Sequence, residues 1–187
     1  MDIASLHDTQ RALRLLEPQL DGRLDILICN AGIMCASPVL RAEGHRIQWA
    51  TNYLDHVLLI QSLLPLLSKT ASSYGDARVV DITSEGLILA PADKGIVFND
   101  LKTKQEYGFG ARWKRYGQSE LTQVLYMSQP AHRNSTSSSI AIHPGVVGTD
   151  LVKALNFADR LLVYATSTVI SPQDGCKNSV WGVTAPR

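Results

Sequence analysis

Tyr116 and Glu120 have residue types and a spacing that suit proton transfer. Residues four apart on a helix lie one turn apart on the same face, so the two side chains should point the same way. Ser84 closes an apolar run that reads as a strand, and it places a hydroxyl at the C-terminal end of that strand. A phenol, a carboxyl group and a hydroxyl are therefore expected in one place, where Tyr116 and Glu120 could act as an acid–base pair.

Apolar runs predict the strands that position this site. Residues 24–29 form a short, almost uninterrupted apolar run, which is typical of a strand buried on both faces of a parallel sheet. We expect two further strands at 79–84 and 139–143. A helix over 114–127 should carry the tyrosine and the carboxylate.

Helical periodicity fills the stretches between these strands. Residues 2–20 carry leucines with the spacing of an amphipathic helix. Residues 43–69 form a long apolar helical segment in which Pro65 should introduce a kink or an end. A final helix should run over 171–181, with a proline in its first turn. The alternation of strands and helices predicts one α/β domain with a parallel sheet over residues 1–187.

Charge and cysteine content argue against several classes of protein. The formal net charge of +1 comes from scattered acidic and basic residues, so we expect no nucleic-acid partner and no anionic membrane surface. Cys29, Cys35 and Cys176 form no CxxC pair and no Cys/His cluster, which predicts reduced thiols, a cytoplasmic location and no metal site. The apolar run 161–170 is too short to span a bilayer. Residues 132–139 should form a polar loop.

Four short motifs occur in an order that resembles one enzyme family. They are Asn30-Ala31-Gly32 after the first apolar run, Ser84 at the end of the second, the Tyr116-x-x-x-Glu120 pair, and Pro144-Gly145 after the third. This order resembles the short-chain dehydrogenase/reductase family, close to its retinol-dehydrogenase and WW-domain-oxidoreductase branch. That family carries a lysine at the position of Glu120.

The resemblance implies an oxidoreductase that moves hydride between a nicotinamide and a carbonyl carbon. In such an enzyme Tyr116 would give or take the proton on the oxygen atom, and Ser84 would hydrogen-bond that atom. Asn52 lies in a stretch that resembles the family's Asn-x-x-Gly-His motif, with Asp55 in place of the glycine, and would hold a water that relays protons behind the lysine. On the residues alone, Asn52 could instead be a buried polar residue, and for His56 we prefer a role in helix packing.

The same match implies a nicotinamide dinucleotide as cofactor, with NADP favoured over NAD. Small residues after the first apolar run would let the adenosine ribose approach closely, although the same tripeptide also suits a plain tight turn. The segment after the third run would hold the nicotinamide carboxamide and a nearby phosphate. The implied cofactor-binding residues are Asp2, Asn30, Ala31, Gly32, Pro144, Gly145, Val147 and Thr149.

The resemblance covers only part of that fold. A dinucleotide-binding Rossmann fold opens with a glycine-rich turn between a strand and a helix, and no Gly-x-Gly-x-x-Gly or Gly-x-x-x-Gly-x-Gly occurs in the sequence. We therefore expect a partial Rossmann fold that lacks the first, glycine-rich βαβ half and keeps three parallel strands. The strand at 24–29 would then expose an unpaired apolar edge, which predicts a homo- or hetero-oligomer formed through that edge.

Glu120 changes the chemistry that the resemblance implies. An ammonium about 4 Å from a tyrosine lowers its pKa from about 10 by roughly three units at an effective dielectric of about 20. An ionised Glu120 would instead raise the pKa of Tyr116. Alcohol oxidation, which needs a tyrosinate, should suffer most.

Three functions remain open from the sequence. The first is an NAD(P)-dependent oxidoreductase acting on a lipophilic carbonyl or alcohol in a lipid or secondary-metabolite pathway. The second is a degenerate relative without redox activity, as a partner subunit or a truncated gene product. The third is a cyclase, dehydratase or isomerase that uses Tyr116 and Glu120 as acid and base. Residues 85–113, as a lid, and 150–170 should shape the substrate pocket with the aromatic residues Phe98, Tyr107, Phe109, Trp113 and Phe157.

Overall fold

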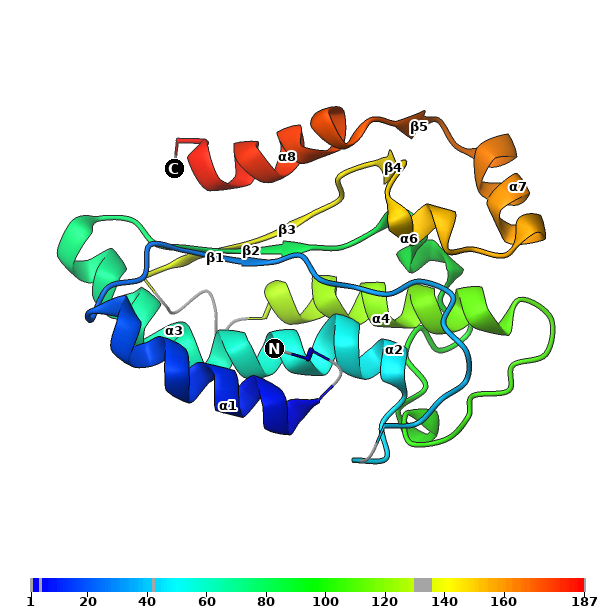
Figure 1. The fold of residues 1–187 in the computed structure, drawn as a ribbon, viewed down its shortest axis with the longest axis horizontal. Coiled ribbons are helices and arrows are strands. Elements are labelled where there is room, and N and C mark those ends of the chain that lie inside the picture. The colour runs from blue at the N-terminus through cyan, green and yellow to red at the C-terminus, as the bar shows by residue number, and fades with distance from the viewer. Residues whose placement is uncertain (1, 4, 42, 130–135, 187) are drawn as a thin grey trace.

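The protein is an α/β fold built on a three-stranded parallel sheet with the strand order β1-β2-β3 (Figure 1). Its strands fall on the three apolar runs that the sequence singles out, so the predicted fold class is confirmed. The computed structural model describes residues 2–3, 5–41, 43–129 and 136–186.

The central sheet has a continuous parallel register. Cys29 of the first strand lies opposite Asp81 of the second, and Asp81 lies opposite Ala141 of the third. A second, two-stranded parallel pair follows the sheet and was not predicted. The strands are β1 (Ile26–Cys29), β2 (Arg78–Ile82), β3 (Ser138–Ile142), β4 (Val146–Val147) and β5 (Val169–Ile170).

Helices and single helical turns connect the strands. Two of the turns, η3 and η4, interrupt the long connection between β2 and α4, and η2 is a π-helical turn between two α-helical segments. The helical elements are α1 (Leu6–Leu16), η1 (Glu17–Leu20), α2 (Ile47–Trp49), η2 (Ala50–Leu54), α3 (Asp55–Tyr74), η3 (Glu85–Leu89), η4 (Phe98–Asp100), α4 (Ala111–Met127), α6 (Asp150–Lys153), α7 (Phe157–Thr166) and α8 (Pro172–Thr184).

The core lies between the sheet and one helical layer. Figure 1 shows α1, α3 and α4 on one side of the sheet and α8 on the other. Ile60, Leu63 and Leu67 of α3 are buried against Val79 of β2. Each such side chain contributes about 1.5–3 kcal/mol when it is removed from water, so this layer fixes the orientation of the strand ends.

β1 differs from its prediction on one face. Ile26 and Ile28 are 42% and 49% exposed, whereas Cys29 is buried on the helical side, so the strand is not buried on both faces as expected. The reason is that α8 packs on β2 and β3 and leaves the other face of β1 uncovered. β1 is nevertheless an edge strand of this sheet, which confirms the predicted apolar edge for the described residues.

Helix boundaries also differ from prediction, most clearly for α1 and α3. The helix expected over 2–20 begins at Leu6, where Ser5 Oγ accepts a hydrogen bond from Asp8 N, and it ends before a 3-10 turn. Pro65 does not end its helix, because α3 continues to Tyr74 and stops at Gly75. Core packing on both sides of the proline outweighs its missing backbone donor. Most of the polar loop expected over 132–139 lies outside the described residues.

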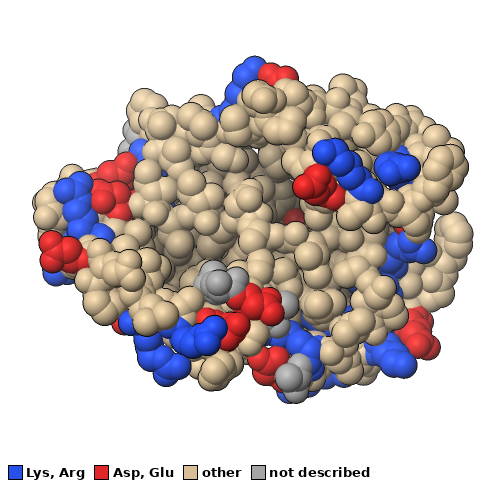
Figure 2. Space-filling view, viewed as in Figure 1, with Lys and Arg blue, Asp and Glu red and all other residues tan. Residues whose placement is uncertain are grey.

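The described helices and the face drawn in Figure 2 show how apolar and charged side chains are distributed. No helix within the described ranges combines the length and the apolar character that crossing a bilayer requires. Figure 2 shows basic and acidic side chains interspersed over one face of the molecule, without a patch of a single sign.

Candidate active site

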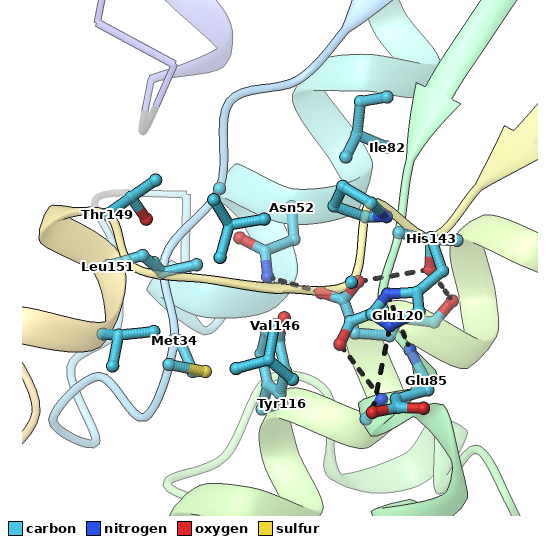
Figure 3. Close-up of a pocket in the computed structure, with 18 of the residues that line it drawn as sticks. Met34, Asn52, Ile82, Glu85, Tyr116, Glu120, His143, Val146, Thr149 and Leu151 are labelled. Atoms are coloured by element: carbon cyan, nitrogen blue, oxygen red, sulfur yellow. Dashed lines mark hydrogen bonds and ion pairs between the residues drawn. The ribbon is translucent and has the colours of Figure 1, made fainter. Parts of the chain in front are cut away.

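A cavity of about 1400 Å³ opens at the carboxyl ends of the three strands. Ligands of open α/β sheets bind at that end because the loops there converge. Figure 3 shows the wall of this cavity, where Tyr116, Glu120, Asn52 and His143 lie close together. The predicted site residues that line it are Asn30, Ala31, Gly32, Asn52, Ser84, Tyr116, Glu120, Pro144, Gly145, Val147 and Thr149.

Tyr116 and Glu120 lie one turn apart on α4 and are 7% and 4% exposed. Gly117 brings this helix close to η3, because a Cβ atom there would lie 2.4 Å from the backbone nitrogen of Ala90. The close approach presses the first turn of η3 against the tyrosine ring, where a Cβ atom on Gly86 would lie 2.8 Å from Tyr116 Cε1. Tyr116 and Glu120 thus share one face of α4, as predicted, and the close packing of the η3 backbone against α4 holds the tyrosine ring in place.

The Glu120 carboxyl group is held by neutral partners. Its Oε1 accepts a hydrogen bond from Asn52 Nδ2 at 3.1 Å, and its Oε2 lies 3.2 Å from Thr83 Oγ1. Burial raises the pKa of Glu120 to about 8, despite the opposing effect of these hydrogen bonds. At neutral pH the group is therefore mostly protonated.

The contacts of Thr83 fit a protonated Glu120. The Thr83 hydroxyl also lies 3.2 Å from the backbone oxygen of Glu120, to which it can donate its single proton. If the carboxyl group of Glu120 carries a proton, its Oε2 can donate a hydrogen bond to Thr83 Oγ1 across the 3.2 Å contact. The effect on Tyr116 expected from the sequence assumed an ionised Glu120, whereas burial keeps this carboxyl group mostly protonated at neutral pH.

Asn52 lies in the π-helical turn η2, a kind of turn that recurs at functional sites. Its Oδ1 accepts from Ile33 N at 2.9 Å, and its Nδ2 lies within 3.1 Å of Ile33 O and Ser119 Oγ. The amide therefore joins the loop after β1 to α4, directly behind Glu120.

Tyr116 keeps its proton in this site. Burial is the main cause that raises its pKa, Glu120 raises it further, and a side-chain hydrogen bond with Ser84 opposes the shift. The predicted direction of the Glu120 effect is therefore correct, but burial is the larger cause. Ser84 follows β2 and accepts a hydrogen bond from Gly86 N at 3.0 Å, which fixes its hydroxyl beside the tyrosine.

Two segments implied by the resemblance both line the cavity. One is the tripeptide after β1, and the other is the stretch after β3 that includes Gly145. Gly145 has φ +92°, and a Cβ atom there would lie 2.9 Å from Ile170 Cδ1, so only glycine suits the position. Asp2 is not among the lining residues, although its neighbour Ile3 is.

His143 and Glu85 also belong to the site and were not predicted as site residues. His143 Nε2 lies 3.8 Å from Glu85 Oε1, and Glu85 N donates to His143 Nδ1 at 3.4 Å. Both residues line the cavity. His143 is the last residue of a predicted strand. Ser84 was singled out because it is a polar residue at a strand end, and the same criterion applies to this histidine.

A buried polar cluster lies on the helical side of the sheet. The thiol sulfur of Cys29, a ring nitrogen of His56 and a carboxylate oxygen of Asp81 lie within 4.8 Å of one another. His56 Nδ1 is 3.2 Å from Asp81 Oδ1. The sequence shows no Cys/His cluster, but the fold brings Cys29 near His56, because adjacent strands place Cys29 opposite Asp81. The burial of His56 against the sheet agrees with a packing role.

The aromatic residues of the expected substrate pocket divide into two groups. Phe109 and Trp113 line the cavity, and Trp113 Nε1 donates to Asp159 Oδ1 at 3.0 Å. The other three, Phe98, Tyr107 and Phe157, are not among its lining residues. The connection before α4 and the α6–α7 region thus form part of the wall, but fewer of their rings face it than expected.

Relatives among curated proteins match this chain over its whole length. It is 34% identical over 201 residues to the short-chain dehydrogenase/reductase drtF of Aspergillus calidoustus, a match to 100% of this chain and 62% of that protein. It is 31% identical over 194 residues to human retinol dehydrogenase 14, a match to 100% of this chain and 54% of that protein. The chain therefore spans between half and two thirds of the length of these relatives.

The likeness extends to solved structures. NADPH-bound carbonyl reductase from chicken fatty liver has a TM-score of 0.60 at 21% identity, over 91% of this chain and 62% of that one. No family model matches the chain. The fold, the order of the strand-end residues and the curated relatives agree, and the chain belongs to the short-chain dehydrogenase/reductase family.

Proposed function

We propose that this chain carries the proton-transfer half of a nicotinamide-dependent carbonyl reductase. The observation behind the proposal is a buried tyrosine, Tyr116, which lies at the cavity wall beside the Ser84 hydroxyl and has a raised pKa. The phenol therefore carries its proton at neutral pH, and the raised pKa disfavours the free tyrosinate that alcohol oxidation would start from. Carbonyl reduction needs that proton, whereas alcohol oxidation needs a tyrosinate, so the site favours reduction.

The proposed reaction uses few side chains. A bound dinucleotide would supply the hydride to the carbonyl carbon. Ser84 hydrogen-bonds the carbonyl oxygen, and Tyr116 donates its proton to that oxygen as negative charge develops there. Glu120, protonated below about pH 8, adds no negative charge beside the tyrosinate that this step leaves. Asn52 and Thr83 hold the Glu120 carboxyl group in place.

The described residues fit the nicotinamide end of such a cofactor. Gly145, at φ +92° in the cavity lining, lets the backbone approach this end of the cofactor without a side chain. The backbone around Gly145 and the hydroxyl of Thr149 would hold the carboxamide. Within the described ranges no glycine-rich strand–turn–helix is present for the pyrophosphate.

The proposal also names NADP as the cofactor and a lipophilic carbonyl compound as the substrate. Solved structures of similar fold include one bound to NADPH and one complexed with NADH, so they support a nicotinamide dinucleotide in general, and NADP is the narrower proposal. Ile88, Leu89 and Leu162 line the cavity together with aromatic rings, and a surface of this kind suits an apolar substrate such as those of lipid or secondary metabolism.

The first test is titration of the purified chain with NADPH and NADH, following cofactor fluorescence and melting temperature together. A ligand that binds only the folded state raises the melting temperature in a saturable way. We expect such a rise, larger for NADPH. A folded chain that responds to neither cofactor would contradict the proposal.

Matched variants separate binding from chemistry. Tyr116→Phe should retain the NADPH-induced rise and lose reduction of a lipophilic aldehyde, because only the phenol proton is removed. Ser84→Ala should weaken reduction by roughly 100-fold or more, because the oxygen loses a preorganised donor. Arg14→Gln, on the exposed face of α1, should change neither measurement.

A non-redox enzyme is the second candidate, favoured by the pKa of Glu120. A carboxyl group with a pKa of about 8 in a cavity wall can act as a general acid or base near neutral pH. An isomerase or dehydratase would exchange the proton next to the carbonyl of a lipophilic ketone in D₂O without any cofactor. Exchange by the wild-type chain that Glu120→Gln abolishes would favour this candidate over reduction.

The third candidate is a partner subunit without turnover. The exposed Ile26 and Ile28 of the β1 edge favour a homo- or hetero-oligomer, since an unpaired edge strand is a template for pairing. Free Cys29, Cys35 and Cys176 fit the cytoplasmic location that we propose for every candidate.

A further inference from the structure

The connection before α4 encloses buried hydrogen-bond donors that have no acceptor. Arg46 and Arg115 are 2% and 8% exposed, and Gln48 and Gln105 are also buried. The buried atoms without a hydrogen-bond partner in the described part of the chain include Arg46 Nε, Arg46 Nη1, Arg115 Nε, Gln48 Nε2 and Gln105 Nε2. Buried polar groups are nearly always hydrogen-bonded, so this concentration of unpaired donors needs an explanation.

Hydrogen bonds link several of these residues into one neighbourhood. Gln48 Oε1 accepts from Ala36 N at 2.9 Å, and Arg115 Nη2 donates to Ala36 O at 3.4 Å. Arg115 Nη1 donates to Gln105 O at 3.2 Å. Because the oxygen of Gln48 is used by a backbone donor, its unpaired atom is the amide nitrogen.

The charges in this neighbourhood are unbalanced. Burial and the nearby Arg115 lower the pKa of Arg46 to about 10, and Tyr107 opposes that shift. Neither arginine has an ion pair with a carboxylate among the residues that the structure describes. The buried Arg41, in contrast, pairs with Asp55 at 2.7 Å. A buried guanidinium without a counter-charge is strongly unfavourable, so this neighbourhood favours the binding of a negative group.

We propose that this cluster binds one small oxyanion with phosphate, sulfate or carboxylate chemistry. A guanidinium matches paired oxygen atoms in geometry and charge, and the amide nitrogens of Gln48 and Gln105 add further donors. Gln105 and Tyr107 belong to the connection between η4 and α4, so the anion joins that connection to the start of α2 and to α4. Arg115 directly precedes Tyr116, and the anion therefore stabilises the turn of α4 that carries the tyrosine.

The test is a series of thermal melts in phosphate, sulfate and acetate, each compared with chloride at equal ionic strength. Excluded salts stabilise every protein without saturation, whereas a specific site saturates. We expect a saturable rise in melting temperature for wild type with at least one oxyanion. Arg46→Met should lose the saturable part, and Arg14→Met, which removes an exposed arginine, should retain it.

A charge reversal makes the test sharper. Arg46→Glu supplies a carboxylate beside Arg115, so this variant should melt at a higher temperature than wild type in oxyanion-free buffer and show no saturable response. Wild-type protein without a saturable response beyond chloride would overturn the proposal, as would an Arg46→Met variant that keeps the response. The wild-type titration decides the question even if a variant fails to fold.

Discussion

Asn52 Nδ2 lies 3.1 Å from Glu120 Oε1 and 3.0 Å from Ile33 O, so one amide joins the π-helical turn, the loop after β1 and α4. The carboxyl group receives a neutral donor from this amide, and its other oxygen lies against the Thr83 hydroxyl. Hydrogen bonds of this kind do not offset the cost of burying a carboxylate, and the raised pKa of Glu120 follows from that difference.

Stability should fall as pH rises through the interval set by Glu120. Its pKa rises from 4.5 to about 8 on folding, so between these values the folded state binds a proton that the unfolded state has lost. The free energy of unfolding should therefore decrease by on the order of 1 kcal/mol per pH unit across this interval, and level off above it. Urea unfolding at several pH values measures the slope. Glu120→Gln should remove this component, and an unchanged slope would contradict the assignment.

Carbonyl reduction should weaken as pH rises above about 8. Ionised Glu120 places negative charge beside the tyrosinate that Tyr116 forms, which disfavours proton donation. The pH profile of kcat/KM with NADPH and a lipophilic aldehyde should show this fall, and Glu120→Gln should shift it to higher pH. Glu120→Lys should favour alcohol oxidation, because an ammonium stabilises the tyrosinate. A wild-type profile that stays flat from pH 7 to 10 would exclude this role.

Gly117→Ala should destabilise the protein by about 1–3 kcal/mol. Its Cβ atom would meet backbone atoms of η3, which cannot move as a flexible side chain does. Gly148→Ala is the matched control, since its Cβ atom would be 3.4 Å from Val169 Cγ1, an ordinary contact. Equal midpoints of urea unfolding for the two variants would show that α4 does not depend on this close approach.

Ile26→Glu should disrupt association through the β1 edge while changing the free energy of unfolding by only about 0.5 kcal/mol, because Ile26 is 42% exposed. Light scattering at several protein concentrations measures association. Leu15→Glu places the same charge on an exposed position of α1 and should leave association unchanged. A wild-type chain that is monomeric at all concentrations would contradict association through the β1 edge.

The sequence predicted the elements whose signal is local. Apolar runs located all three strands of the central sheet, and the polar residue after such a run located Ser84 at the cavity. Helical spacing placed Tyr116 and Glu120 on one face, which the structure shows. Each of these features depends on neighbours within a few residues, so the sequence alone was sufficient.

Features that depend on distant segments were not predicted. The exposed face of β1 depends on where α8 packs. Cys29 lies near His56 because α3, which carries the histidine, packs on β1. The protonation of Glu120 depends on the burial that packing around α4 produces. His143 had a local signal at its strand end, but its partner Glu85 comes from another loop.

The three cysteines differ in burial, and this difference turns them into reporters of local opening. Cys176 is exposed and should react with a thiol reagent at once, and the half-buried Cys35 should react more slowly. Cys29, whose pKa is strongly raised by burial, can react only after the edge strand separates from the helical layer. The labelling rate of Cys29 therefore measures how often β1 detaches, without any engineered probe.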